Sequence, residues 1–179
     1  MQKEPNLNSE IVSKIEKSLG EKTTPEDLFD YIYAVLHSPT YRKKYKEFLK
    51  IDFPRIPYPT DAETFHALAA LGAQLVAIHV MKDFDEAEDV LFEDGGDRVV
   101  GKVEWKDGDV FVNKKSRFTN VEEATFNQYI GGYQPLQKWL KDRKGRALSD
   151  DDISHWKRIV RALRRTAALM SEIDRVRIG

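Results

Sequence analysis

One acid, a second acid and a lysine around a short alternating segment have the order found in metal-dependent nucleases. Asp97 precedes the run Glu104-Trp105-Lys106. In such enzymes two carboxylates hold Mg²⁺ and the lysine polarises water or the scissile phosphate. The pattern is short, and a soluble turn rich in Lys, Asp and Gly gives the same letters. The pattern therefore gives only weak support to a metal-dependent nuclease, which ranks below the two hypotheses that follow from the basic residues described next.

Other chemical patterns in the sequence favour structural roles. The segment from Gly96 to Lys102 resembles the start of a phosphate-binding P-loop, but Val103 stands where Ser or Thr must bind magnesium. His66 and His79 lack metal-ligand spacing and are predicted to be hydrogen-bonded core residues. The sequence contains no nucleophile elbow, dinucleotide fingerprint or methyltransferase motif. We expect a chain with no catalytic activity of its own, no metal and no cofactor.

Basic residues form the strongest remaining signal. Residues 1–97 carry 11 basic and 19 acidic side chains, whereas residues 133–179 carry 12 and 6. A basic segment on an acidic body suits a nucleic-acid face on one side, or a head-to-tail contact between copies of the chain. Lysine and arginine neutralise phosphates, and glutamine can also read base edges. The predicted DNA-binding residues, with Lys106 in the same basic stretch, are Arg98, Lys102, Lys114, Lys115, Arg117, Tyr133, Gln134, Lys138, Lys141, Arg143, Lys144 and Arg146.

Composition sets the class of protein. The chain has 179 residues, 41% of them hydrophobic, which suits one globular domain or two small ones. It has no cysteine, which excludes disulfides, thiolate metal sites and a cysteine nucleophile. It also lacks an apolar stretch long enough for a signal peptide or a transmembrane helix. We expect a cytoplasmic protein without membrane contact.

Helical patterns fill the first half of the chain. Residues 1–22 predict a short helix or connector that ends at Gly20, and residues 24–81 predict a helical body that opens with the cap Thr24-Pro25. Within it we expect a helix over 41–50 and a buried helix over 61–81, where Gly72 lets a neighbour approach closely. Three prolines in residues 52–59 predict an extended strap.

The hydrophobic period then changes from helical to alternating. Residues 82–97 predict an acidic linker, and residues 98–130 predict a β-element with a hairpin turn at Lys106–Asp109 and further strands over 114–118 and 126–130. Two helices follow within 134–175, the second opened by a capping box of Ser149 and Asp152. The fold class is α+β: a helical body, a small antiparallel β-element and two C-terminal helices that pack back on the body.

Four phrases of the sequence resemble one known family. They are DLFDYIYAVLHSPTYRKKY (27–45), FPRIP (53–57), IGGYQPLQKWLKDRKGR (130–146) and the segment 152–174, which begins DISH and ends MSEID. They are similar to the C-terminal specificity domain of Type ISP restriction-modification enzymes and related adenine-specific DNA methyltransferases. In that family a large polypeptide joins nuclease, helicase-like ATPase and N6-adenine methyltransferase parts, and the C-terminal domain recognises the DNA target.

The resemblance implies a function for residues 24–179. It implies a target-recognition domain that binds double-stranded DNA sequence-specifically, with the methyltransferase and helicase parts of a larger polypeptide as partners. Cleavage, ATP hydrolysis and methyl transfer are not expected here, because their motifs are absent from the sequence. Two alternatives stay open: a helical protein–protein interaction module that docks through its basic C-terminal helix, and the metal-dependent nuclease.

Overall fold

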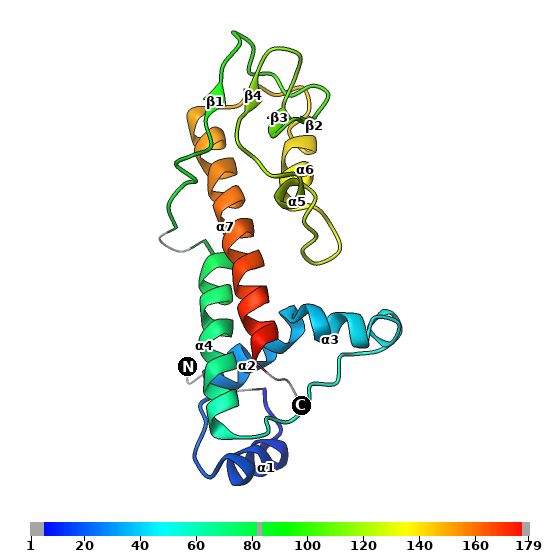
Figure 1. Ribbon diagram of the computed structural model, residues 1–179, viewed down its shortest axis with the longest axis vertical. Coiled ribbons are helices and arrows are strands. Elements are labelled where there is room, and N and C mark those ends of the chain that lie inside the picture. Colours follow the sequence, from blue (N-terminus) through cyan, green and yellow to red (C-terminus); the bar gives the residue numbers. More distant parts are fainter. Residues whose placement is uncertain (1–5, 82–83, 177–179) are drawn as a thin grey trace. The chain divides into compact units, whose positions relative to one another are not determined.

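The computed structural model describes residues 6–81 and 84–176, and the chain divides into two compact units. The first contains residues 1–80 and 166–179, and the second contains residues 81–165. The long helix α7 (Asp150–Arg175) belongs to both units (Figure 1). Its residues 150–165 are part of the second unit, and its residues 166–175 are part of the first. Seven α-helices and four short strands in the described residues confirm the α+β class. None of the helices described is long and apolar enough to cross a membrane.

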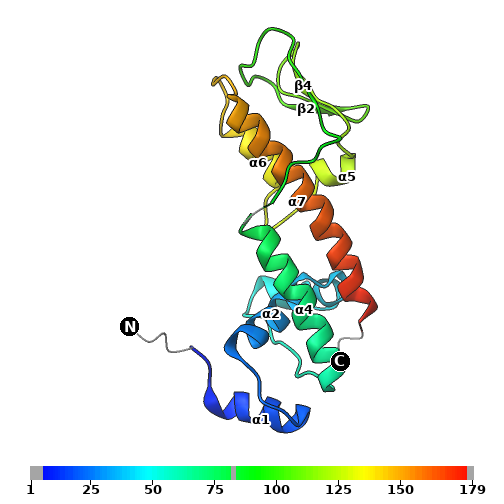
Figure 2. The same ribbon diagram turned by 90° about the vertical axis from the view of Figure 1, so that its left-hand side faces the viewer.

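The first unit is helical. It contains α1 (Ser9–Leu19), α2 (Pro25–His37), α3 (Pro39–Lys44), the short 3-10 helix η1 (Phe48–Lys50), α4 (Ala62–His79) and the end of α7 (Figure 2). Thr24 caps α2 and Pro25 begins it, as predicted, and Asp27 completes a capping box that was not predicted. The single helix expected over 41–50 is wrong, because the chain leaves α3 after Lys44. The chain turns there, and the proline strap that follows returns to α3. The Tyr41 hydroxyl of α3 donates to the Arg55 carbonyl of the strap at 2.9 Å.

Helix α4 packs closely on α2, as predicted at Gly72. A Cβ at that position would lie 1.9 Å from the Asp30 carbonyl oxygen, so only glycine fits. The two histidines of α4 differ in environment. His79 is hydrogen-bonded inside the unit, to the Tyr33 hydroxyl at 2.7 Å and to Thr166 at 3.0 Å. His66 is exposed and pairs with Glu21, so its prediction as a core residue is wrong.

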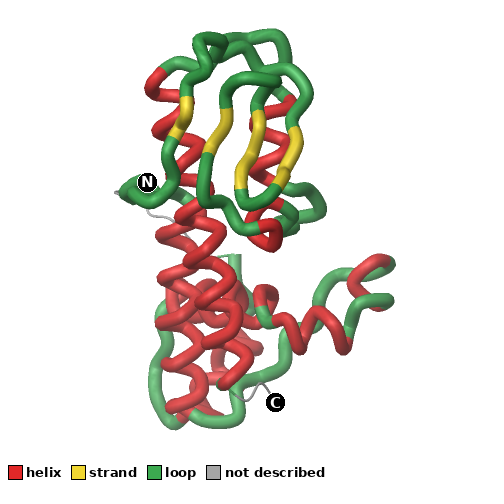
Figure 3. The backbone as a smooth tube through the Cα atoms, turned by 45° about the horizontal axis from the view of Figure 1, so that its top comes forward, coloured by secondary structure: helices red, strands yellow, loops and turns green. Residues whose placement is uncertain are grey.

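The second unit contains one antiparallel sheet. Its strands are β1 (Phe92–Glu93), β2 (Glu104–Lys106), β3 (Asp109–Phe111) and β4 (Arg117–Phe118), in the spatial order β1-β4-β3-β2 (Figure 3). The predicted hairpin joins β2 to β3 through Asp107 and Gly108, both at positive φ. The segment expected to be only an acidic linker supplies the edge strand β1, which pairs with β4.

The strand predicted over 126–130 is wrong. Residues Glu123–Phe126 form the short helix α5, and α6 (Pro135–Lys141) follows after a turn. Thr125 and Phe126 are both buried although they are consecutive, which one helical turn allows and an alternating strand does not. In the stretch 114–118, only Arg117–Phe118 is strand.

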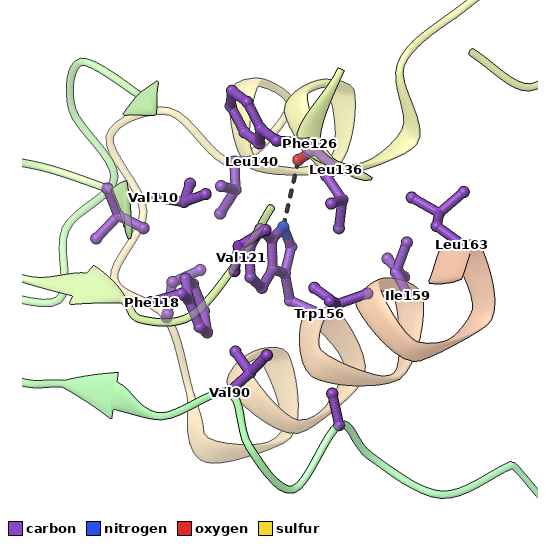
Figure 4. Close-up of a cluster of buried hydrophobic side chains, with 14 of the residues drawn as sticks. Val90, Val110, Phe118, Val121, Phe126, Leu136, Leu140, Trp156, Ile159 and Leu163 are labelled. Carbon is purple, nitrogen blue, oxygen red and sulfur yellow. Dashed lines mark hydrogen bonds between the residues drawn. The ribbon is translucent and has the colours of Figure 1, made fainter. Parts of the chain in front are cut away.

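The inner face of the sheet packs on Trp156 of α7. Cross-strand neighbours Trp105, Val110, Phe118 and Phe92 form one inner row. The ring centroids of Phe118 and Trp156 lie 4.0 Å apart in a stacked arrangement (Figure 4). Trp156 is fully buried and its indole N–H donates to the Leu136 carbonyl at 3.3 Å, which ties α6 to α7. The alternate row, Glu104, Phe111, Arg117 and Glu93, therefore forms the outer face.

Candidate nucleic-acid interface

A hollow of about 550 Å³ lies on the outer side of β2 and β3 and is lined by lysines. Lys102, Lys106 and Lys114 contribute to its wall, together with Phe111 and Glu104. Lys102 is paired with Glu104, its ammonium 2.6 Å from the carboxylate. Neither of the other two lysines forms an ion pair among the residues described, although Lys106 lies opposite Asp109 in the sheet and its charge helps to lower the pKa of Glu104. The hollow therefore carries a net positive charge, which suits an anionic ligand.

Backbone hydrogen bonds gather more lysines at this end of the unit. The Gly101 N–H donates to the Val112 carbonyl at 2.7 Å, and the Gly145 N–H donates to the Val100 carbonyl at 2.8 Å. The loop after Val112 contains Lys114 and Lys115, and Lys144 precedes Gly145. Three segments that are distant in sequence thus place their basic residues near one another.

Asn113 organises the loop that carries two of these lysines. Its side-chain oxygen accepts the N–H groups of Lys115 and Ser116 at 2.7 and 2.8 Å, and its amide donates to the carbonyls of Asp97 and Val99. The sequence reasoning missed this residue. An asparagine before Lys-Lys-Ser is nevertheless a recognisable turn signal, because Asn side chains bond the backbone two and three residues ahead.

Two predicted DNA-binding arginines of the sheet region are held by carboxylates. Arg98 contacts Asp94 and Asp150, each at 2.7 Å. Arg117 lies between Glu93 at 2.6 Å and Asp109 at 3.0 Å on the outer face of the sheet. Both side chains therefore join segments of the second unit to one another.

Asp152 holds two further arginines of the predicted set. Arg146 contacts its carboxylate at 2.6 Å, and Arg143 does so at 3.3 Å while its guanidinium lies 3.4 Å from the centre of the Trp139 ring. Burial alone would raise the pKa of Asp152, but the Ser149 N–H and the two guanidinium groups lower it to about 2. This clamp fixes the loop between α6 and α7. Arg143 and Arg146, both predicted to bind DNA, thus also hold this loop in place.

Helix α6 presents the remaining predicted residues. Lys138 is paired with Asp142 at 2.7 Å, whereas Lys141 donates to the Gln137 side chain at 3.1 Å. The Gln134 amide donates to the Asn127 carbonyl at 3.2 Å, and Tyr133 is exposed. Within the described stretch 92–148, the lysines without a carboxylate partner are Lys106, Lys114, Lys115, Lys141 and Lys144.

The basic face of α7 is covered by the acidic segment of the same chain. Lys157 pairs with Glu86 at 2.9 Å, and Arg161 lies 3.6 Å from Asp85. Arg164 contacts Asp89 at 2.8 Å. The complementary charges that made this helix a candidate for docking on another protein are thus engaged within the second unit.

The two acids that suggested a nuclease are engaged by other groups of the chain. The Asp97 carboxylate accepts the Val99 N–H at 2.9 Å, and Glu104 is paired with Lys102. Across the described residues, no group of three His, Asp or Glu side chains could hold a metal ion. After Gly101 and Lys102 the chain enters β2 and not the helix that a P-loop requires.

Three solved structures share this fold. The Type ISP restriction-modification enzyme LlaBIII bound to DNA has a TM-score of 0.73 and 18% identity, with 97% of this chain and 12% of that chain covered. A nuclease-deletion mutant of the Type ISP restriction-modification enzyme LlaGI in complex with a DNA substrate mimic has a TM-score of 0.64 and 21% identity. The match covers 85% of this chain and 14% of that chain. The cryo-EM structure of the DrdV–DNA complex has a TM-score of 0.78 and 21% identity, and the match covers 94% of this chain and 20% of that chain. The chain therefore spans only 12–20% of the length of these solved chains.

Sequence comparison identifies the family. No curated protein sequence matches the chain. Residues 1–172 match the family model of the Type ISP C-terminal specificity domain, which covers nearly the whole chain and includes all the phrases quoted above except the last two residues of the fourth. The chain belongs to the Type ISP C-terminal specificity domain family.

Proposed function

We propose that this chain binds double-stranded DNA sequence-specifically, as the target-recognition domain of a restriction-modification adenine methyltransferase. The observation that carries the proposal is the set of lysines without carboxylate partners around the outer hollow of the second unit and on α6. Unpaired lysines can neutralise phosphates without first breaking an internal ion pair. The structures with this fold contain DNA or a DNA mimic, which supports the same ligand.

The proposal divides the predicted residues into two roles. Lys106, Lys114, Lys115, Lys141 and Lys144 contact phosphates. The exposed Tyr133 is available for bases, with the half-buried Gln134, whose amide is bonded to Asn127, beside it. The ion-paired arginines at positions 98, 117, 143 and 146 position the loops that carry these lysines. An arginine held by two contacts is a poor choice for a new ligand, because the ligand must replace both of them.

The proposal also places the chain within a larger system. Because the chain spans a small share of its solved relatives, we assign methyl transfer and helicase activity to other parts of a larger cytoplasmic polypeptide. This chain then contributes recognition without catalysis and needs no cofactor. The interaction-module alternative loses support, since the basic face of α7 is already paired with residues 85–89.

A salt titration of duplex binding tests the proposal. Each phosphate contact contributes about −0.9 to the slope of log affinity against log salt, so five lysines predict a slope of about −4.5. A double Lys114→Ala, Lys115→Ala variant should make the slope shallower by about 2. The matched control is Lys43→Ala, Lys46→Ala, which removes two exposed lysines of the first unit and should leave the slope unchanged. Salt-independent binding, or equal loss in both variants, would refute the assigned surface.

A further inference from the structure

A tight turn before α6 presents two tyrosine rings to solvent. Ile130 and Tyr133 form an antiparallel bridge with two backbone hydrogen bonds of 3.0 and 3.3 Å. Gly131 and Gly132 lie between them at φ 58° and 94°, as the two central residues of a type I′ turn require. Tyr129 is 59% exposed and Tyr133 is 51% exposed. Neither hydroxyl has a hydrogen-bond partner among the described residues.

The turn is held at its base. The Asn127 carbonyl accepts the Gln134 amide at 3.2 Å, and the Asn127 side chain accepts the Gln137 amide at 2.9 Å. Ile130, between the two tyrosines in sequence, packs against the core of the second unit. The tyrosines therefore project from an ordered support, and a ligand that stacks on them meets a preorganised site.

The surroundings of the turn suit a nucleic acid better than an apolar protein surface. Side-chain amides and Lys141, which is linked to Gln137, lie next to it, and Lys141 has no carboxylate partner in the described part of the chain. Apart from the adjoining residues, no described atom lies within 4 Å of a Cβ built on either glycine, so the tip of the turn is open. An aromatic face stacks on any base, because every base has a π-face.

We propose that Tyr129 and Tyr133 stack on bases of the bound DNA, and that the chain therefore prefers a duplex with an unstacked base to an intact one. This inference rests on the proposed function and adds the ligand contact of the turn. In an intact duplex each base face is covered by its neighbours. A tyrosine can stack only where a base is already displaced, or where binding energy opens the stack.

Fluorescence anisotropy on two pools of duplexes tests this preference. Both pools carry the same random sequence, and one has a single bulged nucleotide. Stacking on one base predicts about 5- to 150-fold tighter binding to the bulged pool. The double Tyr129→Ala, Tyr133→Ala variant should remove this preference, whereas the double Phe variant should keep it because the rings remain. Tyr58→Ala is the matched control, since Tyr58 is 56% exposed in the first unit.

The outcomes separate this inference from the function on which it rests. Equal binding of the two pools by the wild type, or a preference that survives the double Ala variant, refutes stacking by the turn while duplex binding stands. If the wild type binds neither pool, the proposed function and the stacking are both refuted. A bulge preference lost only with the two alanines, at an unchanged salt slope, supports the inference.

Discussion

From the sequence alone, Asp152 is predicted to do no more than cap a helix. The structure gives it further contacts, so the substitution Asp152→Asn should destabilise the second unit by more than the loss of a helix cap would. Its side chain is 13% exposed and accepts hydrogen bonds from Arg146, Arg143 and Ser149. The interactions that lower its pKa from 3.8 to about 2 stabilise the charged folded form. A shift of this size corresponds to about 2 kcal/mol in the free energy of unfolding.

The pH dependence follows from the direction of this shift. The folded pKa lies below the unfolded value, so the stabilisation is complete above about pH 4 and is lost as the pH falls toward 2. At about pH 3 roughly half of it should remain. The amide introduced by Asp152→Asn does not titrate, so the difference between wild type and variant should be largest at neutral pH and shrink in acid.

Urea unfolding followed by tryptophan fluorescence measures this difference at several pH values. Asp151→Asn is the control, because Asp151 is exposed in the same helical turn and loses only its interaction with the helix dipole, about 0.3–1 kcal/mol. Equal midpoints for the two variants at neutral pH would refute the clamp. A difference that does not shrink in acid would refute the assigned pKa.

Two core substitutions give further expected outcomes. Trp156→Ala should lower the free energy of unfolding by about 3–5 kcal/mol, because it removes a large buried side chain. Trp156→Phe should lower it by less, because a ring still faces Phe118. The urea midpoints of the two variants test this difference. Gly72→Ala should cost about 1–3 kcal/mol, since its Cβ would clash with the Asp30 carbonyl. Gly101→Ala, whose Cβ would have no neighbour nearer than 3.7 Å, should be tolerated. Urea midpoints compare these two glycine variants as well, and an equal loss of stability would contradict the packing of α2 on α4.

Local signals predicted the helices well and the small strands poorly. The capping boxes at Thr24 and Ser149 mark helix starts through residues three apart, so the sequence shows them directly. Strand β1 has two residues and exists through its pairing with β4, where Glu93 lies opposite Arg117. An acidic segment gives no local indication of such a partner. The false strand over 126–130 likewise arose from apolar residues with different surroundings, since Phe126 ends α5, Tyr129 is exposed and Ile130 lies in the turn before α6.

The candidate interface was predicted in composition but not in role. Residue type alone predicts twelve DNA-binding residues, and the four arginines among them have carboxylate partners. Arg98 and Asp94 are four residues apart, whereas the other contacts join segments from different elements. Such pairs depend on the tertiary fold, so a single sequence cannot separate a lysine available to DNA from an arginine engaged in a clamp.

Segment charge is therefore a misleading guide to where a phosphate can bind. Residues 133–179 carry 12 basic and 6 acidic side chains, yet three basic residues of α7 are matched by acids between 85 and 89. Residues 98–132 carry 6 basic and 5 acidic side chains, and they supply every residue that lines the outer hollow. There Lys114 and Lys115 lie in the loop between β3 and β4 and form no ion pair among the described residues, whereas Lys106 ends β2 opposite Asp109. The positive surface arises where the fold separates opposite charges, and charge counted along the chain does not record that separation.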